Sequence, residues 1–212
     1  MLFRSSTDTE NNQIASFYTG AMADAGQLSF RNTKDAKLAI ISPNDPGAMV
    51  SYAEECRTLK IPFIFDPGQQ CSRMSGDELK DGIKGAHILI CNDYEFELIR
   101  QKTEMGEKEV LEEVDLLIVT KGEKGSTVIT KKGSVDVPAV TPRKIADPTG
   151  VGDAFRGGLL KGFAMGLSAE NAAKIGSVAA TYCLEHLGGT YHSYTWDEFE
   201  ARYREHFGVL KS

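Results

Sequence analysis

Short apolar runs of strand length alternate along this chain with longer amphipathic stretches, and this alternation constrains the fold more than any other feature. Each run ends in turn or polar residues, as strands do. The four runs are Leu38–Ser42, Pro62–Phe65, His87–Cys91 and Leu116–Thr120. The helical stretches between them are a stripe of Met49, Ala53, Cys56 and Leu59, then Asp93–Lys102 and Glu107–Val114. Strands that alternate with helices predict a layered α/β fold with a largely parallel sheet.

The second half of the chain has a different pattern. Two runs of β-branched residues flank a Lys-Lys-Gly turn, which predicts a hairpin. The runs are Ser126–Thr130 and Ser134–Val137. Two long helices should follow, over Asp153–Met165 and Ser168–Leu187, with Gly188 as the C-terminal cap of the second. Thr195 and Glu198 have the spacing of a capping box and predict a last helix.

Composition limits the class of protein and its partners. With 212 residues and 41% hydrophobic content, the chain is long enough to form one globular domain, 1–212, with a buried core. A net charge of −6 disfavours nucleic acid and anionic membranes as partners. The four cysteines are widely spaced and there is no apolar run of 18 residues, which favours buried thiols in a soluble, cytoplasmic protein. A small-molecule substrate fits these properties best.

A glycine-rich loop from Asp147 to Phe155 carries the strongest chemical signal. Gly150 and Gly152 permit positive φ and close backbone approach, so successive N–H groups can turn towards a phosphate where a helix begins. Asp153 would lie at the mouth of this anion site, where a carboxylate can accept the proton of an attacking hydroxyl. The alternative is a plain strand-to-helix turn whose first-turn Asp is favoured by the helix dipole.

The stretch Asp-Pro-Thr-Gly-Val-Gly-Asp-Ala-Phe-Arg-Gly-Gly, which begins at Asp147, resembles the C-terminal signature of the ribokinase-like (PfkB) carbohydrate kinases, in particular the bacterial adenosine-kinase-like branch. The resemblance implies a three-layer α/β/α fold and transfer of the ATP γ-phosphoryl group to the primary hydroxyl of a nucleoside or sugar, with adenosine favoured. It implies that Gly150, Val151 and Gly152 hold the phosphoryl group and that Asp153 is the base. Pro148 and Val151 depart from the usual Asp-Thr-x-Gly-Ala-Gly-Asp loop.

Two further motifs follow predicted strands. Asn92-Asp93-Tyr94-Glu95 resembles the family's Asn-x-x-Glu motif, which implies that Asn92 and Glu95 arrange Mg²⁺, water and phosphate; the same spacing is also a capping box. The segment Thr120–Gly125 resembles the family's nucleotide-lining segment, and an ordinary β-turn is the alternative. The resemblance thus implies an ATP site built from Asn92, Thr120, Lys121, Gly122, Gly125 and Gly152.

The position of these motifs supports a shared site. Ligands of open α/β sheets bind beyond the carboxyl ends of the strands, where Asp66, Asn92, Thr120 and Asp147 should converge, although Asp66 opens a Pro-Gly turn and is a weak candidate. The chain has no Gly-x-x-x-x-Gly-Lys-[Ser/Thr] sequence, which disfavours a P-loop kinase.

Other assignments rest on the family resemblance alone. It implies a site for a monovalent cation such as K⁺ at Asp147, Thr149 and Ser193, and it places His192 near the nucleotide. For His192 and Ser193 the alternative is a surface loop that joins two helices. It also implies that Asn12, Gln13 and Phe17 contact the acceptor as part of a lid.

The usual N-terminal strand, lid and Gly-Gly-x-x-x-Asn helix of the family have no match here. We therefore expect residues 1–25 to be a lid remnant and 36–212 the nucleotide-binding core. An uncovered apolar sheet edge would favour self-association, such as a homodimer. We also expect weak ATP binding and little phosphorylation by this chain. The alternatives are a sugar kinase of ribose or fructose type, and a nucleotide-binding remnant without turnover.

Overall fold

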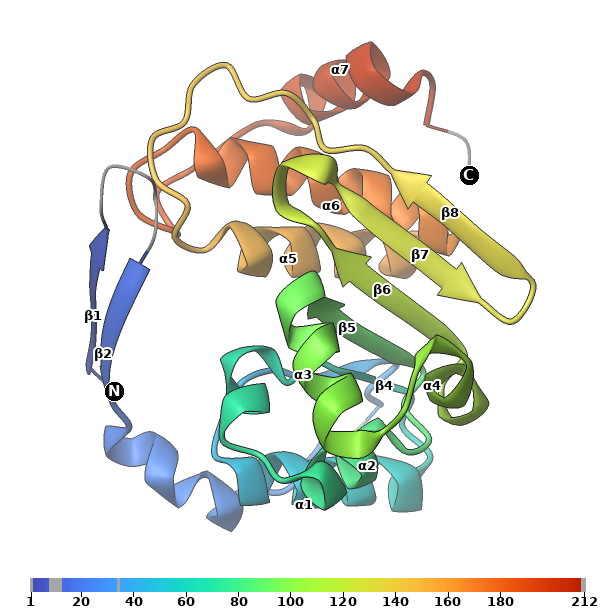
Figure 1. Ribbon diagram of the computed structural model, residues 1–212. Coiled ribbons are helices and arrows are strands. Elements are labelled where there is room, and N and C mark those ends of the chain that lie inside the picture. The colour runs from blue at the N-terminus through green and yellow to red at the C-terminus, as the bar shows by residue number, and fades with distance from the viewer. Residues whose placement is uncertain (1, 8–12, 34, 211–212) are drawn as a thin grey trace. The chain divides into compact units, whose positions relative to one another are not determined.

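The computed structural model describes residues 2–7, 13–33 and 35–210. The chain divides into two compact units. Unit 1 comprises Met1–Val119 and Ile129–Gly133, and unit 2 comprises Thr120–Val128 and Ser134–Ser212. Six strands form one sheet in the order β3-β4-β5-β6-β7-β8, and β1 and β2 form a separate antiparallel pair (Figure 1).

The elements follow one another as α/β alternation predicts. The strands are β1 (Leu2–Thr7), β2 (Gln13–Tyr18), β3 (Ala39–Ile41), β4 (Phe63–Phe65), β5 (Ile88–Asn92), β6 (Leu116–Thr120), β7 (Ser126–Thr130) and β8 (Gly133–Val137). The α-helices are α1 (Pro46–Leu59), α2 (Gly76–Ile83), α3 (Asp93–Thr103), α4 (Glu107–Glu113), α5 (Val151–Ala164), α6 (Ala169–Leu184) and α7 (Trp196–Phe207). Short 3₁₀ helices are η1 (Gly20–Gln27), η2 (Phe30–Asn32), η3 (Gly68–Ser72) and η4 (Gly122–Lys124).

The parallel strands of unit 1 form where the sequence predicts them. β3 and β4 pair in parallel with Ile41 opposite Phe65, and β4 pairs in parallel with β5, with Phe65 opposite Leu89. Phe63 and Phe65 lie in the main core of this unit, and the intervening Ile64 is also fully buried. Strands that are buried on both faces are typical of a parallel sheet in an α/β fold.

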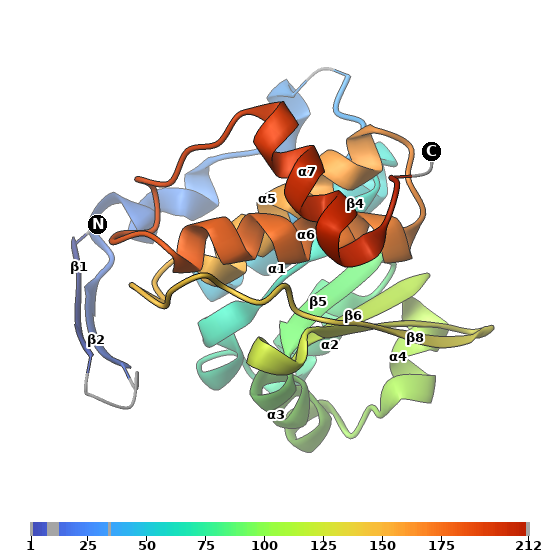
Figure 2. The ribbon, with the colours of Figure 1, turned by 90° about the horizontal axis from the view of Figure 1, so that it is seen from above.

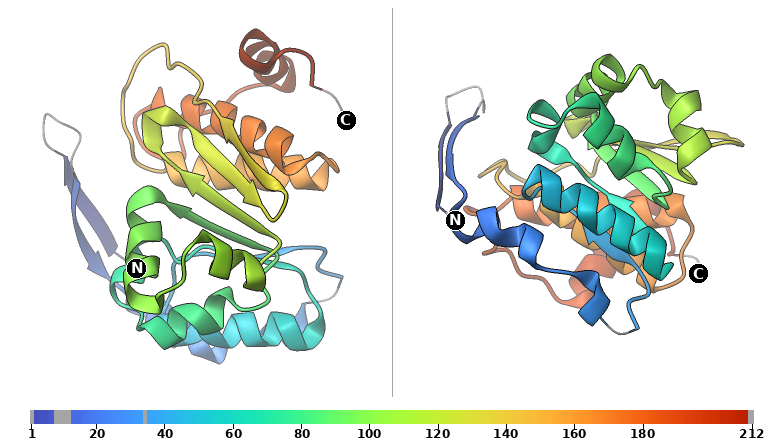
Figure 3. Two further views of the ribbon diagram at one scale, coloured as in Figure 1. Left: turned by 45° about the vertical axis from the view of Figure 1, so that its right-hand side comes forward. Right: turned by 90° about the horizontal axis from the view of Figure 1, so that it is seen from below.

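Helix α2 was not predicted, although its start is marked in the sequence. The Ser75 hydroxyl accepts the Glu78 N–H at 3.2 Å, and the Glu78 carboxylate accepts the Ser75 N–H at 2.7 Å, which is a complete capping box. Helices α1 and α2 lie side by side in unit 1 (Figure 3). Met49 of α1 and Leu79 of α2 are fully buried in its core.

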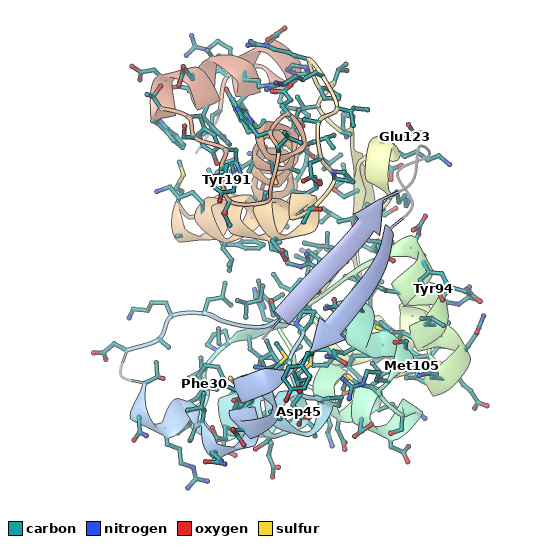
Figure 4. The ribbon with its side chains drawn as sticks, turned by 90° about the vertical axis from the view of Figure 1, so that its left-hand side faces the viewer. Phe30, Asp45, Tyr94, Met105, Glu123 and Tyr191 are labelled. Carbon is teal, nitrogen blue, oxygen red and sulfur yellow. The ribbon has the colours of Figure 1, made fainter. Side chains whose placement is uncertain are left out.

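The segment with η1 and η2 is attached to α1 through Glu55. The Glu55 carboxylate accepts the Ser29 hydroxyl at 2.7 Å and the Phe30 N–H at 2.8 Å, and the first of these bonds is the main cause that lowers the pKa of Glu55. Phe30, labelled in Figure 4, packs edge-on against Tyr52 of α1 with ring centroids 5.5 Å apart. These contacts join the chain after the β1–β2 pair to unit 1.

In unit 2, helix α6 ends earlier than the sequence predicts. The helix ends at Leu184, and Glu185 is its C-cap in a right-handed conformation, so the prediction that Gly188 caps α6 is wrong. Glu185 is held by Arg202 of α7 in a buried ion pair of 2.6 Å. Gly188 has the expected positive φ of 78°, but its N–H binds a side chain in the glycine loop, as described below.

Two expectations from composition can be compared with the structure. Cys56, Cys71, Cys91 and Cys183 are all free and buried, and burial raises the pKa of Cys56 to about 11 and that of Cys71 to about 12. Within the described ranges, no helix has both the length and the apolar character needed to span a membrane.

Lys102 offers a test of how unit 1 is held together. Its ammonium donates to the carbonyl oxygens of Cys71, Ser72 and Met74 at 2.7–2.9 Å, which joins the end of α3 to the turn before α2. Because Lys102→Met leaves these oxygens without their charged donor, we expect it to lower the free energy of unfolding by about 2 kcal/mol in urea denaturation. Lys80→Met, at an exposed position of α2, is the control. Equal stability of the two variants would contradict this role.

Candidate active site

The glycine loop ends in a helix whose first turn has no side-chain cap. Gly150 is the N-cap of α5, with φ of 81°, and as a glycine it provides no side-chain cap, while the Val151 N–H donates to the Pro148 carbonyl at 3.4 Å. A Cβ at Gly150 would lie 2.8 Å from the Gly189 Cα, so both the conformation and the space require glycine. The first N–H groups of an α-helix have no partner within the helix, and with the helix dipole they favour an anion.

Asp153 lies in this first turn, as predicted. Its side chain is 87% exposed, and Oδ1 is 3.5 Å from Nη1 of Arg156. The helix begins at Val151, two residues before the predicted start, so Val151, Gly152 and Asp153 form its first turn. An exposed carboxylate beside uncapped N–H groups can accept a proton from a hydroxyl that attacks a bound phosphate.

Asp147 holds the loop before α5. Oδ1 accepts the Thr149 N–H and Oδ2 accepts the Gly188 N–H, each at 2.9 Å. Hydrogen bonds from the Thr149 N–H and hydroxyl, and then from the Gly188 N–H, lower the pKa of Asp147. The Ala146 N–H also donates to the Leu184 carbonyl at 2.9 Å, so the loop is fixed to the end of α6.

Helix α5 is supported by close packing on α6, and the two lie side by side in Figure 2. A Cβ at Gly158 would come within 2.8 Å of the Gly176 Cα, and one at Gly162 would lie 2.5 Å from the Ala172 Cα. These glycines let the two backbones approach closely. The helix that carries Asp153 therefore has a rigid support.

The predicted nucleotide segment after β6 forms a compact turn in unit 2. The Lys121 N–H donates to the Gly125 carbonyl at 2.7 Å, and η4 lies between them. A Cβ at Gly125 would lie 2.1 Å from the Val137 carbonyl oxygen. The Lys121 ammonium donates to the Thr127 hydroxyl at 2.6 Å and lies 3.9 Å from Asp136. Contacts of Thr120, Lys121, Gly122 and Gly125 with ATP stay a prediction.

In unit 1, Asn92 and Glu95 form the capping box of α3. The Asn92 Oδ1 accepts the Glu95 N–H at 2.7 Å, and the Glu95 Oε2 accepts the Asn92 N–H at 2.8 Å. The structural alternative is thus confirmed, and the magnesium role stays a prediction. A carboxylate has about four acceptor positions, so the capping bond leaves Glu95 able to bind a hard cation or its water.

For the remaining predicted residues that the structure describes, it gives positions but no contact that supports their predicted roles. Asp66 follows β4 and is fully buried, so it is less suited than Asp153 to meet a substrate. Asn12 is outside the described residues, and Gln13 and Phe17 lie in β2. Ser193 lines a groove of about 270 Å³ in unit 2 with Tyr182 and Arg202. Its part in a cation site with Asp147 and Thr149 stays a prediction.

His192 has a setting that the sequence did not indicate. Its Nδ1 is buried without a hydrogen-bond partner, and its ring lies 6.2 Å from that of Tyr194, centroid to centroid. The neighbouring Tyr191, labelled in Figure 4, is 82% exposed. Within the described ranges no three His, Cys, Asp or Glu side chains form a group that could hold a metal ion.

The lowered pKa of Asp147 predicts a pH dependence of stability. Because its folded-state pKa is below the unfolded value, the stabilisation is fully present above the unfolded pKa, about 3.9, and is lost as the pH falls through the folded-state pKa. Asp147→Asn should therefore lose most stability at pH 7 and progressively less below pH of about 4. Urea denaturation across this range measures it, with Glu112→Gln on α4 as an exposed control. A difference from wild type that does not vary with pH would contradict the prediction.

Comparisons with known proteins identify the family of this chain. The model of the pfkB family of carbohydrate kinases matches residues 4–196. A nucleoside kinase of Methanocaldococcus jannaschii is 33% identical over 200 residues, which are 94% of this chain and 66% of that protein. The chain thus spans about two thirds of the length of this relative.

Solved structures give the same family. The nucleoside kinase of Burkholderia thailandensis in complex with inosine is 38% identical, with a TM-score of 0.95 over 98% of this chain and 68% of that one. Its structure in complex with ADP-inosine gives a TM-score of 0.94, with 38% identity over 99% of this chain and 66% of that one. With an α/β sheet, a Gly150–Asp153 helix start and a family match over most of its length, this chain belongs to the pfkB family of carbohydrate kinases.

Proposed function

We propose that this protein is a nucleoside kinase that transfers the γ-phosphoryl group of ATP to the primary hydroxyl of a purine nucleoside. The observation that carries the proposal is the exposed carboxylate of Asp153 in the uncapped first turn of α5. The inosine and ADP-inosine complexes of the Burkholderia thailandensis relative support a nucleoside as acceptor. Adenosine is the acceptor that we favour, and inosine is the nearest competitor.

In the proposed reaction, the hydroxyl oxygen forms a bond to the γ-phosphorus, the bond between that phosphorus and the β–γ bridging oxygen breaks, and ADP leaves. Asp153 accepts the hydroxyl proton as attack develops. N–H groups at the start of α5 donate to the phosphoryl oxygens. Since little covalent chemistry falls to the protein, most of the rate enhancement is positional and electrostatic.

Asn92 and Glu95 are the residues that would hold Mg²⁺, partly through water. Their amide and carboxylate oxygens are suitable donors for this ion, which keeps several waters and binds through few protein ligands. When bound, Mg²⁺ neutralises charge on the phosphates. A monovalent cation such as K⁺ at Asp147, Thr149 and Ser193 is a further part of the proposal.

The direct test is a coupled assay of ADP release with a panel of acceptors, combined with calorimetric titration of ATP. The panel contains adenosine, inosine, cytidine, ribose and fructose. We expect weak ATP binding and only slow transfer, with purine nucleosides, above all adenosine, as the acceptors. ATP binding without transfer to any acceptor would instead support a nucleotide-binding protein, and turnover restricted to ribose or fructose would support a sugar kinase.

Asp153→Asn tests the base. Because the amide cannot accept the proton, we expect turnover to fall by at least about 100-fold while the Kd for ATP changes little. Glu170→Gln is the matched control, because Glu170 is a first-turn acid of α6 with a basic partner, Lys174, at 2.6 Å. Turnover of Asp153→Asn within a few-fold of wild type would remove Asp153 from this role.

Glu95→Gln tests the metal role against the structural one. Glu198→Gln is its matched control, since Glu198 makes the same capping box with Thr195 at the start of α7. Because the glutamine side-chain oxygen can still accept the N-cap N–H, both variants should keep the box and unfold at nearly the wild-type urea concentration. Only Glu95→Gln should raise the Mg²⁺ concentration that gives half the maximal rate. In calorimetric titrations with ATP, it should likewise raise the Mg²⁺ concentration that gives half the maximal increase in ATP affinity. Equal Mg²⁺ dependence of the two variants would leave Glu95 with a capping role alone.

A further inference from the structure

The chain between β8 and α5, residues 138–150, contains no helix or strand (Figure 1). Val140, near its start, is buried in the apolar core of unit 2. Asp147, near its end, is held by the hydrogen bonds described above. We call residues 141–147 the linking segment, and most of them before Asp147 are exposed. Because few apolar contacts hold such a segment, its position depends on its polar contacts.

Glu185, the C-cap of α6, binds the linking segment and helix α7 with one carboxylate. Its Oε1 accepts the Arg143 N–H, and its two oxygens accept the guanidinium of Arg202 on α7 at 2.6 and 2.7 Å. Nη2 of Arg202 also donates to the Thr141 carbonyl at 3.3 Å. Arg202 therefore holds the linking segment directly, through Thr141, and indirectly, through Glu185.

The same ion pair fixes the end of α6. The carbonyl of Leu184, directly before Glu185, accepts the N–H of Ala146 at 2.9 Å and that of Asp147 at 3.3 Å. A guanidinium that fixes the Glu185 carboxylate therefore also restrains the carbonyl that holds the backbone of Asp147. A continuous series of contacts thus leads from α7 to the turn before α5.

Stability alone does not explain this pair. The side chains of Arg202 and Glu185 are only 3% and 7% exposed, so both charges lose most of their hydration. Apolar residues of similar volume often stabilise a protein as well as a buried ion pair does. Hydrogen bonds from Arg202 are the main cause that lowers the pKa of Glu185, so the carboxylate stays ionised and keeps its acceptor positions. An apolar pair could not give the linking segment such a defined geometry.

We propose that Arg202 is a positioning residue for phosphoryl transfer, which acts through Glu185 and the linking segment on the turn held by Asp147. Its role is to fix the turn that leads into α5, and it need not touch the substrate. The inference rests on the proposed function, because the position of this turn affects a reaction only if Asp153 takes part in one.

The test replaces both charges, since Arg202→Met alone would leave a buried carboxylate unpaired and could prevent folding. Glu185→Met/Arg202→Met roughly keeps the volume, so we expect it to fold with a melting temperature near that of wild type. In native-state hydrogen exchange measured by NMR, the N–H groups of Thr149 and Gly188 should exchange about 10-fold faster, as expected when hydrogen bonds to a charged group weaken. The kcat should fall by about 10- to 100-fold with little change in the KM for ATP, because misalignment affects the transition state more than binding.

Tyr203→Leu is the matched control for stability. Tyr203 is buried on α7 in the core of unit 2, so its replacement loosens the packing of α7 but keeps the Glu185–Arg202 pair. This variant should lose stability and still show wild-type exchange at Thr149 and Gly188, with wild-type kcat. Arg202→Lys keeps the charge without the planar donors, and should lie between wild type and the double variant in both measurements.

Wild-type exchange at Thr149 and Gly188 in the double variant would overturn the inference. So would equal effects of Tyr203→Leu and the double variant, because loss of α7 packing would then account for them. Faster exchange with an unchanged kcat would mean a structural role alone and would also overturn it. If the double variant does not fold, the same two measurements on Arg202→Lys decide.

The failure of the proposed function gives a different result. A wild-type chain that transfers phosphate to no acceptor would refute the proposed function. A wild-type chain that is active, together with an equally active double variant, would refute only the role of Arg202.

Discussion

Two hydrogen bonds from backbone N–H groups to the Asp147 carboxylate fix the chain directly before α5. One comes from Thr149 and closes the turn before the helix, and the other comes from Gly188, 41 residues further along the chain. They hold Gly150 in its left-handed conformation against Gly189. Since Asp153 and the first-turn N–H groups follow directly, the geometry of the proposed phosphate site depends on a carboxylate that need not touch substrate.

The close packing of α5 on α6 also fixes the position of the start of α5. Gly158 and Gly162 of α5 meet Gly176 and Ala172 of α6 at distances that no larger residue permits. Glycine weakens a helix by up to about 1 kcal/mol at each position relative to alanine, so the close packing has to offset that loss. What results is a short, rigid connection between the end of α6, which holds Asp147, and the start of α5, which carries Asp153. Preorganisation of this kind is what phosphoryl transfer requires of a protein.

The sequence predicts the elements well where a local signal exists. Strand β6 has the predicted bounds, and β4 and β5 differ from theirs by one residue at one or both ends, because buried strands are continuous apolar runs between turn residues. Helix α2 was missed although Ser75 and Glu78 have capping-box spacing. Gly188 was misread because a glycine near a helix end normally caps that helix. Its actual partner, Asp147, is distant in sequence, and no local pattern reports such a bond.

The same limit applies to the candidate site. Asp153 and the glycines around it were found because loop, helix start and acid are adjacent in sequence. The buried Nδ1 of His192 was not expected, because burial depends on tertiary packing and not on neighbours in the sequence. For Asn92 and Glu95 the difficulty is the reverse: Ser75–Glu78 and Thr195–Glu198 form the same box elsewhere in this chain. A motif that recurs as a helix start cannot identify a metal site by itself. What distinguishes Asn92 is its position at the carboxyl end of a buried parallel strand, where α/β proteins bind their ligands.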